Sequence, residues 1–350
     1  MITPGRRERL LAALTVVALA TLLPELTSAN TSVDVLLRPV PLLLFAVLYG
    51  VPALVLREVT VRTSSGLAGL FVGGLAYGVL NEALLSKTSF RPGGLPVELT
   101  ALARPELGWG WLAFLAVWQA LASIVFPVAI AHSLFPWQSN SAWLNRVQLT
   151  LLALPALGLA VLIFLSPQGG HDGTAVELAG WLGLVTVLLV VAGRLRGPWA
   201  VHPGRLVPAL LGGPGLVVFL TAAVLLAGLR PPDPVFVLLF GAGVAAVGWA
   251  FVRLGLGRLP GLGVVALGWY VVTALFAHRA APDWSLAVTL LVLTLAGVGV
   301  GRVYRRLAAL GTSGSVASWS GASGPWSRVW SWWRRVAARR PRPQAPAVRP

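Results

Sequence analysis

Long runs of apolar residues follow one another along the chain, and short polar segments separate them. An α-helix needs about 20 apolar residues to cross roughly 30 Å of hydrocarbon, so each such run predicts a membrane-spanning helix. We expect ten spans, at Leu10–Leu26, Leu36–Leu56, Gly66–Leu85, Trp109–Phe135, Gln148–Ser166, Val176–Ala192, Leu206–Leu229, Pro234–Val252, Pro260–Ala277 and Ser285–Gly301. The predicted fold class is therefore an all-α, polytopic transmembrane helical bundle that occupies residues 1–301.

The first run has a second interpretation. Three arginines precede it and small residues follow it, which is also typical of a secretory signal peptide. The cleavage motif is imperfect, so we favour a retained first helix over a cleaved leader.

The chain changes character after residue 301. Residues 302–324 have the composition of a flexible linker, and residues 341–350 that of a disordered tail. In residues 325–340 apolar side chains recur at helical spacing opposite arginines, which predicts an amphipathic helix lying in the bilayer interface. The side chains expected to bind the membrane surface, with anionic lipid as partner, are Trp326, Trp330, Trp333, Arg334 and Arg335. Nucleic acid stacked on the same side chains is the alternative; we favour lipid and expect no nucleic-acid partner.

Composition agrees with a membrane location. Of the 350 residues 57% are hydrophobic and 11% are charged, against roughly 25% charged in soluble domains. The net charge of +16 fits the excess of arginine in cytoplasmic loops better than it fits nucleic-acid binding. The absence of cysteine excludes disulfides and cysteine-ligated metals, and the sequence predicts no metal site and no cofactor.

The distribution of charge predicts the orientation. With a cytoplasmic N-terminus and ten alternating spans, the inner side holds 21 of the 27 basic residues. Of the 11 acidic residues only Glu8 and Glu58 fall there. This asymmetry follows the positive-inside rule. We therefore expect a multi-pass protein of the cell membrane with both termini cytoplasmic.

The segment Gly66–Lys87 organises the predicted bundle. Its glycines and alanines, Gly69-xxx-Gly73 among them, form a small-residue face that allows another helix to approach closely. Asn81 and Glu82 lie near the predicted outer end of this span. An ionisable residue in a membrane span is a functional candidate by default because its burial is costly.

Other polar residues belong to the predicted outer side. Glu82, Lys87, Glu25 and Arg38 are expected to form an outward polar cluster, either as a structural ion-pair network or as a site for a substrate or ion. Gln119, with Ser123 one turn later, is the deepest polar position and either joins helices or lines a pathway.

At the predicted inner side, Arg57 and Glu58 are interpreted as an interfacial anchor that ends the second span. His132 lies in an aromatic interface belt, where a hydrogen-bonded structural role is favoured over a ligand role.

Several spans contain proline, including Pro52, Pro127 and Pro155. Each proline leaves a carbonyl that a neighbouring group must satisfy or that must face a cavity. Broken helices of this kind mark substrate sites in transporters. Kinks that improve packing are the alternative, and we favour them.

Five segments together resemble an uncharacterised family of prokaryotic polytopic membrane proteins. They are PEL (Pro24–Leu26), LYG (Leu48–Gly50), LRE (Leu56–Glu58), AYGVLNEALLSKTSF (Ala76–Phe90) and SIVFPVAIAHSLFP (Ser123–Pro136). The family's third span reads closer to YG-x-x-EE-G-L, with Asn81 here at the first Glu and Ala83 at the Gly; Gln119 stands where relatives tend to carry a His. The resemblance covers roughly the first 140 residues and implies no activity.

The third span also resembles that of CPBP-type intramembrane proteases, whose pattern is E-E-x-x-x-R followed by F-x-x-x-H on a later helix. Here Asn81 replaces the first Glu, Ser86 the Arg and Val128 the Phe before His132. The resemblance implies a membrane enzyme as an alternative function. The leading hypothesis is a permease-like or ligand-binding protein with Glu82 at its site, and a non-catalytic membrane scaffold is the third.

Overall fold

The structure is a computed structural model of the whole chain. It describes residues 6–28, 31–87, 109–166, 174–197, 199, 201–202, 206–228, 232–254, 256, 259–278 and 284–312. The chain divides into two compact units, Met1–Tyr304 and Arg305–Pro350. The fold and the sites below belong to the first unit.

Helices dominate the described residues. In chain order they are α1 (Arg6–Ser28), α2 (Val33–Leu36), α3 (Pro39–Phe45), the π-helical η1 (Ala46–Gly50), α4 (Val51–Thr63), α5 (Gly66–Val79), the π-helical η2 (Leu80–Leu85), α6 (Trp109–Gln119), the π-helical η5 (Ala120–Val125), α7 (Phe126–Leu134), the 3₁₀ turn η6 (Pro136–Gln138), α8 (Arg146–Leu165), α9 (Ala175–Arg194), α10 (Leu206–Gly228), α11 (Asp233–Leu254), α12 (Gly261–Ala277) and α13 (Trp284–Thr312). Strands β1 (Val201–His202) and β2 (Leu259–Pro260) form a short parallel pair.

The predicted all-α polytopic bundle is confirmed. Within the described residues, nine helical segments are long and apolar enough to cross a membrane. The predicted span Pro260–Ala277 corresponds to α12, a shorter apolar helix of 17 residues. The remaining predicted spans each correspond to one of the nine segments.

Two predicted boundaries are wrong. The second span runs from Pro39 to Thr63 rather than Leu36–Leu56, because Pro39 is favoured at the first helical position and Ser64, at φ 54°, ends the helix. Arg57 and Glu58 thus lie inside this span. The last helix continues past Gly301 to Thr312, since the arginines, alanines and leucines there favour helix.

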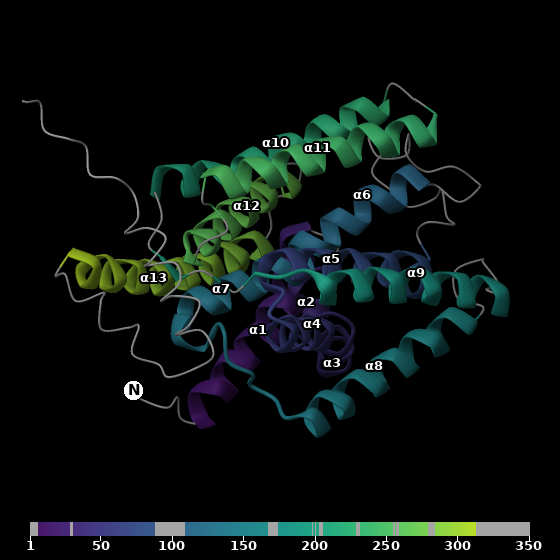
Figure 1. Cartoon of the computed structure of the whole chain (residues 1–350), viewed down its shortest axis with the longest axis horizontal. Helices are drawn as coiled ribbons and strands as arrows, with labels where there is room; N and C mark the ends of the chain where they lie inside the picture. The colour runs from purple at the N-terminus through teal and green to yellow at the C-terminus, as the bar shows by residue number, and fades with distance from the viewer. Residues whose placement is uncertain are drawn as a thin grey trace, which may run out of the picture. The chain divides into compact units, whose positions relative to one another are not determined.

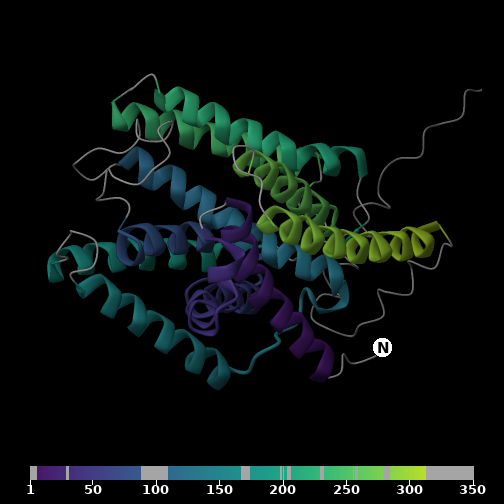
Figure 2. The same ribbon diagram turned by 180° about the vertical axis from the view of Figure 1, so that it is seen from behind.

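Helix α5 packs closely against α6, η5 and α9 (Figures 1 and 2), and its glycines lie at these contacts. A Cβ atom placed on Gly78 would lie 2.5 Å from the Cα of Ala116, and one on Gly74 would lie 2.9 Å from the Cα of Ala120. A Cβ on Gly69 would lie 2.9 Å from the carbonyl oxygen of Ala192 in α9. Backbones therefore approach too closely for any side chain, which confirms the predicted small-residue packing face.

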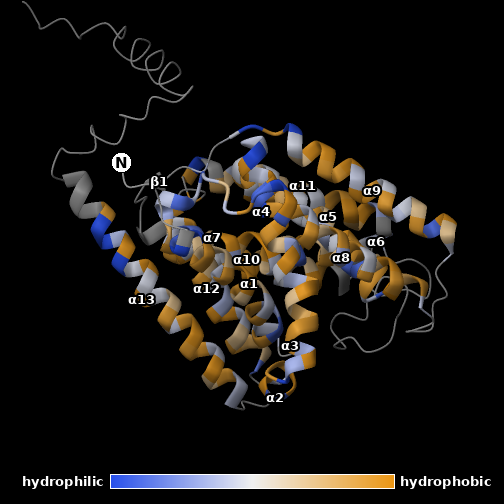
Figure 3. Cartoon of the chain, turned by 90° about the horizontal axis from the view of Figure 1, so that it is seen from below, coloured by the Kyte–Doolittle hydropathy of each residue, from blue (hydrophilic) through white to orange (hydrophobic). Residues whose placement is uncertain are grey.

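Helix α1 is part of the core. Ala12, Val16, Ala20 and Leu23 are fully buried, and the helix contacts η1, α7 and α12. By contrast, most of α9 and the first part of α13 carry the colour of hydrophobic residues in Figure 3. Large apolar side chains such as Val187 and Leu295 are exposed there. An exposed apolar surface of this extent is stable when hydrocarbon surrounds it.

Two tyrosines satisfy carbonyls that prolines leave without a helical donor. In the α-helical register Pro52 would donate to the carbonyl of Leu48 if it had an N–H, and the Tyr77 hydroxyl donates to that oxygen at 2.9 Å. In the π-helical register Pro127 would donate to the carbonyl of Ala122, and the Tyr270 hydroxyl donates to that oxygen instead. These two carbonyls are satisfied by neighbouring helices, as the packing interpretation of the prolines expects.

Candidate functional site

The carboxylate of Glu82 is buried in the bundle and accepts hydrogen bonds from three side chains. Its side chain is 3% exposed. Oε1 accepts from Nδ2 of Asn81 and from Nε2 of Gln119, each at 2.9 Å. Oε2 accepts from the Ser86 hydroxyl at 3.2 Å. Ser123 extends the network by donating to Oε1 of Gln119 at 2.5 Å, and we call these five residues the Glu82 cluster.

The two helices that carry the Glu82 cluster both depart from α-helical geometry at the cluster. Asn81 and Glu82 belong to η2, and Ser123 belongs to η5, which follows Gln119 directly. A π-helical turn aims its side chains differently from an α-turn, and such turns occur frequently at functional sites. Pro127 after η5 indicates one of these distortions in the sequence; η2 has no such indication.

Glu82 lies three residues from the end of the span Gly66–Leu85, as predicted. The sequence places it near the outer end of its span, within reach of lipid headgroups. Gln119, its partner, is ten residues into the span that begins at Trp109, which corresponds to about 15 Å of helical rise. The hydrogen bond between Glu82 and Gln119 therefore connects the two predicted polar positions.

A second buried carboxylate lies near the Glu82 cluster. Glu25 is 6% exposed and accepts from the Thr31 hydroxyl at 2.6 Å. Tyr49 of η1 interacts with the side chains of Glu25 and Asn81 and electrostatically with Glu82. Tyr77 packs edge-on against Tyr49, with 6.2 Å between the ring centroids. Two carboxylates from different helices thus share a tyrosine-lined region.

The two predicted cationic members of the outward cluster lie elsewhere. Lys87 is buried and donates from Nζ to the carbonyl of Ser166 at 2.8 Å, with the Phe164 ring 5.5 Å away. Arg38 is exposed at the N-cap of α3. Among the described residues, the ion pairs are those of Glu58 with Arg57 and Arg62.

A separate polar cluster surrounds Arg57, and its members are Arg57, Glu58, His132, Gln138 and Trp143. Arg57 pairs with Glu58, donates from Nε to Nε2 of His132 at 3.0 Å, and donates from Nη2 to the Gln138 carbonyl at 2.7 Å. Its guanidinium carbon lies 3.4 Å from the centroid of the Trp143 ring. Arg57, Glu58 and His132 are all completely buried.

This Arg57 cluster corrects the interpretation of Arg57 and Glu58 as an interfacial anchor. Glu58 also accepts from the backbone N–H groups of Trp143 and Leu144, at 2.9 and 3.3 Å. The pair therefore holds the segment after α7 against α4. The sequence indicates this only indirectly, through the tryptophans and amides that follow Phe135.

The structure does not bring His132 to Glu82. His132 belongs to the Arg57 cluster, and its ring packs edge-on against Trp143 and Trp199. Among the described residues, no group of three or more His, Asp or Glu side chains is placed to hold a metal ion. The juxtaposition of Glu82 and His132 that a CPBP-like enzyme requires is absent from the described part of the chain.

Some predicted residues and segments cannot be located. Trp326, Trp330, Trp333, Arg334 and Arg335 lie outside the described residues, as do the segments 313–324, 325–340 and 341–350. The interfacial helix and the tail therefore remain predictions.

Comparison with known protein families gives a match. The sequence profile of an uncharacterized membrane protein family matches residues 14–324. The match extends well past the first 140 residues, where the resemblance was recognised. No curated protein and no solved structure matches the chain.

Proposed function

The chain belongs to an uncharacterized membrane protein family, and from that premise we propose that it is a permease-like protein that binds a small cation, a proton included, at Glu82. The observation that carries the proposal is the burial of this carboxylate between two π-helical turns. A carboxylate in a membrane span is costly and is retained mostly where it serves an ion or substrate pathway.

The donors to Glu82 support ligand exchange. Asn81, Ser86 and Gln119 donate from side chains, which can rotate. When a cation reaches the carboxylate, the amide groups of Asn81 and Gln119 can turn to present their oxygens. Amide, hydroxyl and carboxylate oxygens are the ligands that hard cations prefer. The neighbouring Glu25 and Tyr49 add further oxygen atoms to the same region.

Ligand-induced stabilisation tests the proposal. The purified chain is unfolded thermally in lithium, sodium, potassium or choline chloride and across a pH series. A cation at 100 times its Kd stabilises the folded state by about 2.7 kcal/mol. We expect at least one alkali cation or proton concentration to shift the unfolding temperature, and Glu82→Gln to remove the shift.

The matched control is Glu8→Gln, in the first turn of α1, which leaves the Glu82 cluster unchanged. Uptake of the active cation into proteoliposomes, or of protons followed by an internal pH dye, then distinguishes a permease from a binding protein. If neither cations nor protons distinguish Glu82→Gln from the wild type, the scaffold hypothesis replaces this proposal.

The proposed orientation places both termini on the cytoplasmic side of the cell membrane. The asymmetry of the charged residues supports it. The chain contains no cysteine, so a single introduced cysteine is a unique label. In sealed cells, Thr174→Cys should react with an impermeant maleimide and Arg196→Cys should react only after lysis; the opposite result would reverse the orientation.

The proposed surface partner of residues 325–340 is anionic lipid. An environment-sensitive dye on Ala337→Cys should report transfer from water to the bilayer in phosphatidylglycerol vesicles more than in phosphatidylcholine vesicles. Arg334→Gln with Arg335→Gln should reduce that difference, because each arginine near an anionic surface contributes about 1 kcal/mol. Equal signals in both lipids would contradict an electrostatic attachment.

A further inference from the structure

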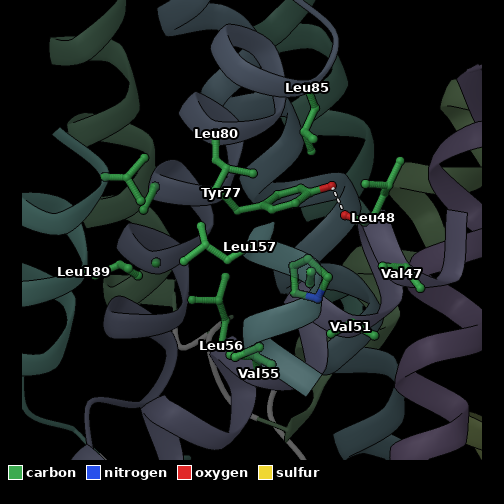
Figure 4. A pocket seen from close by; sticks show the side chains of 16 residues that line it. Val47, Leu48, Val51, Val55, Leu56, Tyr77, Leu80, Leu85, Leu157 and Leu189 are labelled. Carbon is green, nitrogen blue, oxygen red and sulfur yellow. Dashed lines mark hydrogen bonds between the residues drawn. The ribbon is translucent and has the colours of Figure 1, made fainter. Parts of the chain in front are cut away.

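An apolar cavity of about 130 Å³ opens between η1, α4, α5, η2, α8 and α9. Figure 4 shows the side chains around it, with the Tyr77 ring across the cavity. The wall is made of aliphatic residues and Tyr77. The Tyr77 hydroxyl already donates a hydrogen bond to the carbonyl of Leu48. Gly73, Ala76, Ala153 and Ala156 line the cavity with side chains too small to fill it.

The cavity lies near the middle of α8, of α9 and of the span Gly66–Leu85, and it extends to Leu85 at the end of that span. Ala156 is ten residues from the start of α8, Tyr77 is eleven residues from the start of α5, and Val185 is ten residues from the start of α9. At 1.5 Å per residue, these positions lie roughly 15 Å from the first residue of each helix. In a bilayer about 30 Å thick, this is the depth of the ends of the lipid tails and not of the headgroups.

The surroundings of the cavity are equally apolar. Leu157 and Leu189, on its rim, are 44% and 39% exposed. The outer face of α8 continues with Leu154 and Leu162, both more than 60% exposed. Water does not fill an apolar cavity of this kind, and a cavity of about 150 Å³ is known to hold a benzene molecule.

We propose that this cavity binds the end of a hydrocarbon tail of a membrane lipid. The depth of the cavity, its apolar wall and its opening beside exposed leucines favour a hydrocarbon tail over a polar ligand. No polar group of the described wall is directed at the occupant. The volume admits a short stretch of chain, so the rest of the lipid lies along α8 and α9 in the bilayer. The proposal is independent of ion binding at Glu82.

Photo-crosslinking tests this site directly. The full chain is reconstituted into vesicles of palmitoyl-oleoyl phosphatidylcholine that contain a phosphatidylcholine with a diazirine at the end of one tail. Ala76 and Tyr77 are 1% and 4% exposed, so only a tail inside the cavity reaches them. We expect adducts on these two residues after irradiation, and excess hexadecane should compete them away.

A matched pair of variants on α8 completes the test. Ala156→Phe fills the cavity and should abolish the adducts on Tyr77, as should Ala153→Phe if the first variant folds poorly. Leu154→Phe, on the exposed face of the same helix, should leave them unchanged.

Two outcomes would overturn the proposal. They are adducts on Leu154 without any on Tyr77, and Tyr77 adducts that survive both filling variants.

Discussion

The Glu82 and Arg57 clusters are both buried and both centred on a charged group, yet their partners differ. Glu58 is held by Arg57 and by two backbone N–H groups. The described donors to Glu82 are the side chains of Asn81, Gln119 and Ser86. Backbone donors are fixed by the fold, whereas side-chain donors can turn away. Main-chain groups therefore hold the Glu58 carboxylate in place, whereas the proposed ligand exchange at Glu82 depends on donors that can rotate.

The largest expected loss of stability comes from breaking the Arg57 cluster. Arg57→Ala leaves the Glu58 carboxylate buried without its principal cation, and removing one member of a buried pair costs about 3–5 kcal/mol. The free energy of unfolding in mixed detergent micelles measures the loss. Arg62→Ala is the control: this pair is 3.6 Å long and its arginine is partly exposed, so about 0–1 kcal/mol is expected.

The equivalent change in the Glu82 cluster sharpens the contrast. Gln119→Ala removes one side-chain donor, and a hydrogen bond between membrane helices contributes on average about 0.6 kcal/mol and at most about 1.7 kcal/mol. Its effect on stability should be well below that of Arg57→Ala, while the cation-dependent shift is lost. A destabilisation as large as that of Arg57→Ala would show that both clusters are structural.

Gly78→Ala should alter the Glu82 cluster without touching any of its side chains. The new Cβ would lie 2.5 Å from the backbone of Ala116, so α6 must move relative to α5. Overpacking of this kind costs about 1–3 kcal/mol and displaces Gln119 from Glu82.

Gly180→Ala is the matched control for Gly78→Ala. No atom lies within 4 Å of the added methyl group at that position. The helix should therefore gain about 0.5–1 kcal/mol in unfolding free energy. If Gly78→Ala proved equally stable, the close approach of α5 and α6 would be contradicted.

A further effect concerns the Tyr270 hydroxyl, which donates to a carbonyl of η5. Tyr270→Phe leaves the Ala122 carbonyl without its donor, at an expected cost of about 1 kcal/mol. Pro127→Ala restores an N–H at the position that would donate to this carbonyl. A double-mutant cycle should therefore show a smaller cost for Tyr270→Phe in the Pro127→Ala background. Additive costs would mean that the hydroxyl does not substitute for the missing N–H.

Much of the fold follows from the sequence, because residues in contact with hydrocarbon must be predominantly apolar. Runs of apolar residues located nine spans and α12, and the glycines of Gly66–Val79 predicted the packing of α5. The predicted end of the second span is wrong because charged residues such as Arg57 and Glu58 usually mark an interface, whereas here they lie inside the span. A charged pair can lie inside a span when its two members neutralise each other and other groups cover them. The sequence alone does not show which groups cover Arg57 and Glu58.

The candidate site was predicted in part. The free-energy cost of burying a polar side chain in a membrane identifies Glu82, Asn81 and Gln119 as candidates. That these side chains meet depends on the π-helical turns η2 and η5, which the sequence does not predict. Tyr49 and Ser86 were missed as members of this region because their types are common near membrane interfaces. Lys87 was expected with Glu82 on grounds of charge, and it donates to Ser166 instead. Pairing by charge alone does not determine which helices meet.

The π-helical turns also have a consequence for how related chains differ in length. A turn closed by an i→i+5 bond holds one more residue than the α-turn it replaces. Deleting one residue from 80–85 or 120–125 would therefore straighten the helix while both of its ends stay in register. Relatives with such a single-residue gap should keep the bundle and lose the alignment of Glu82 with Gln119.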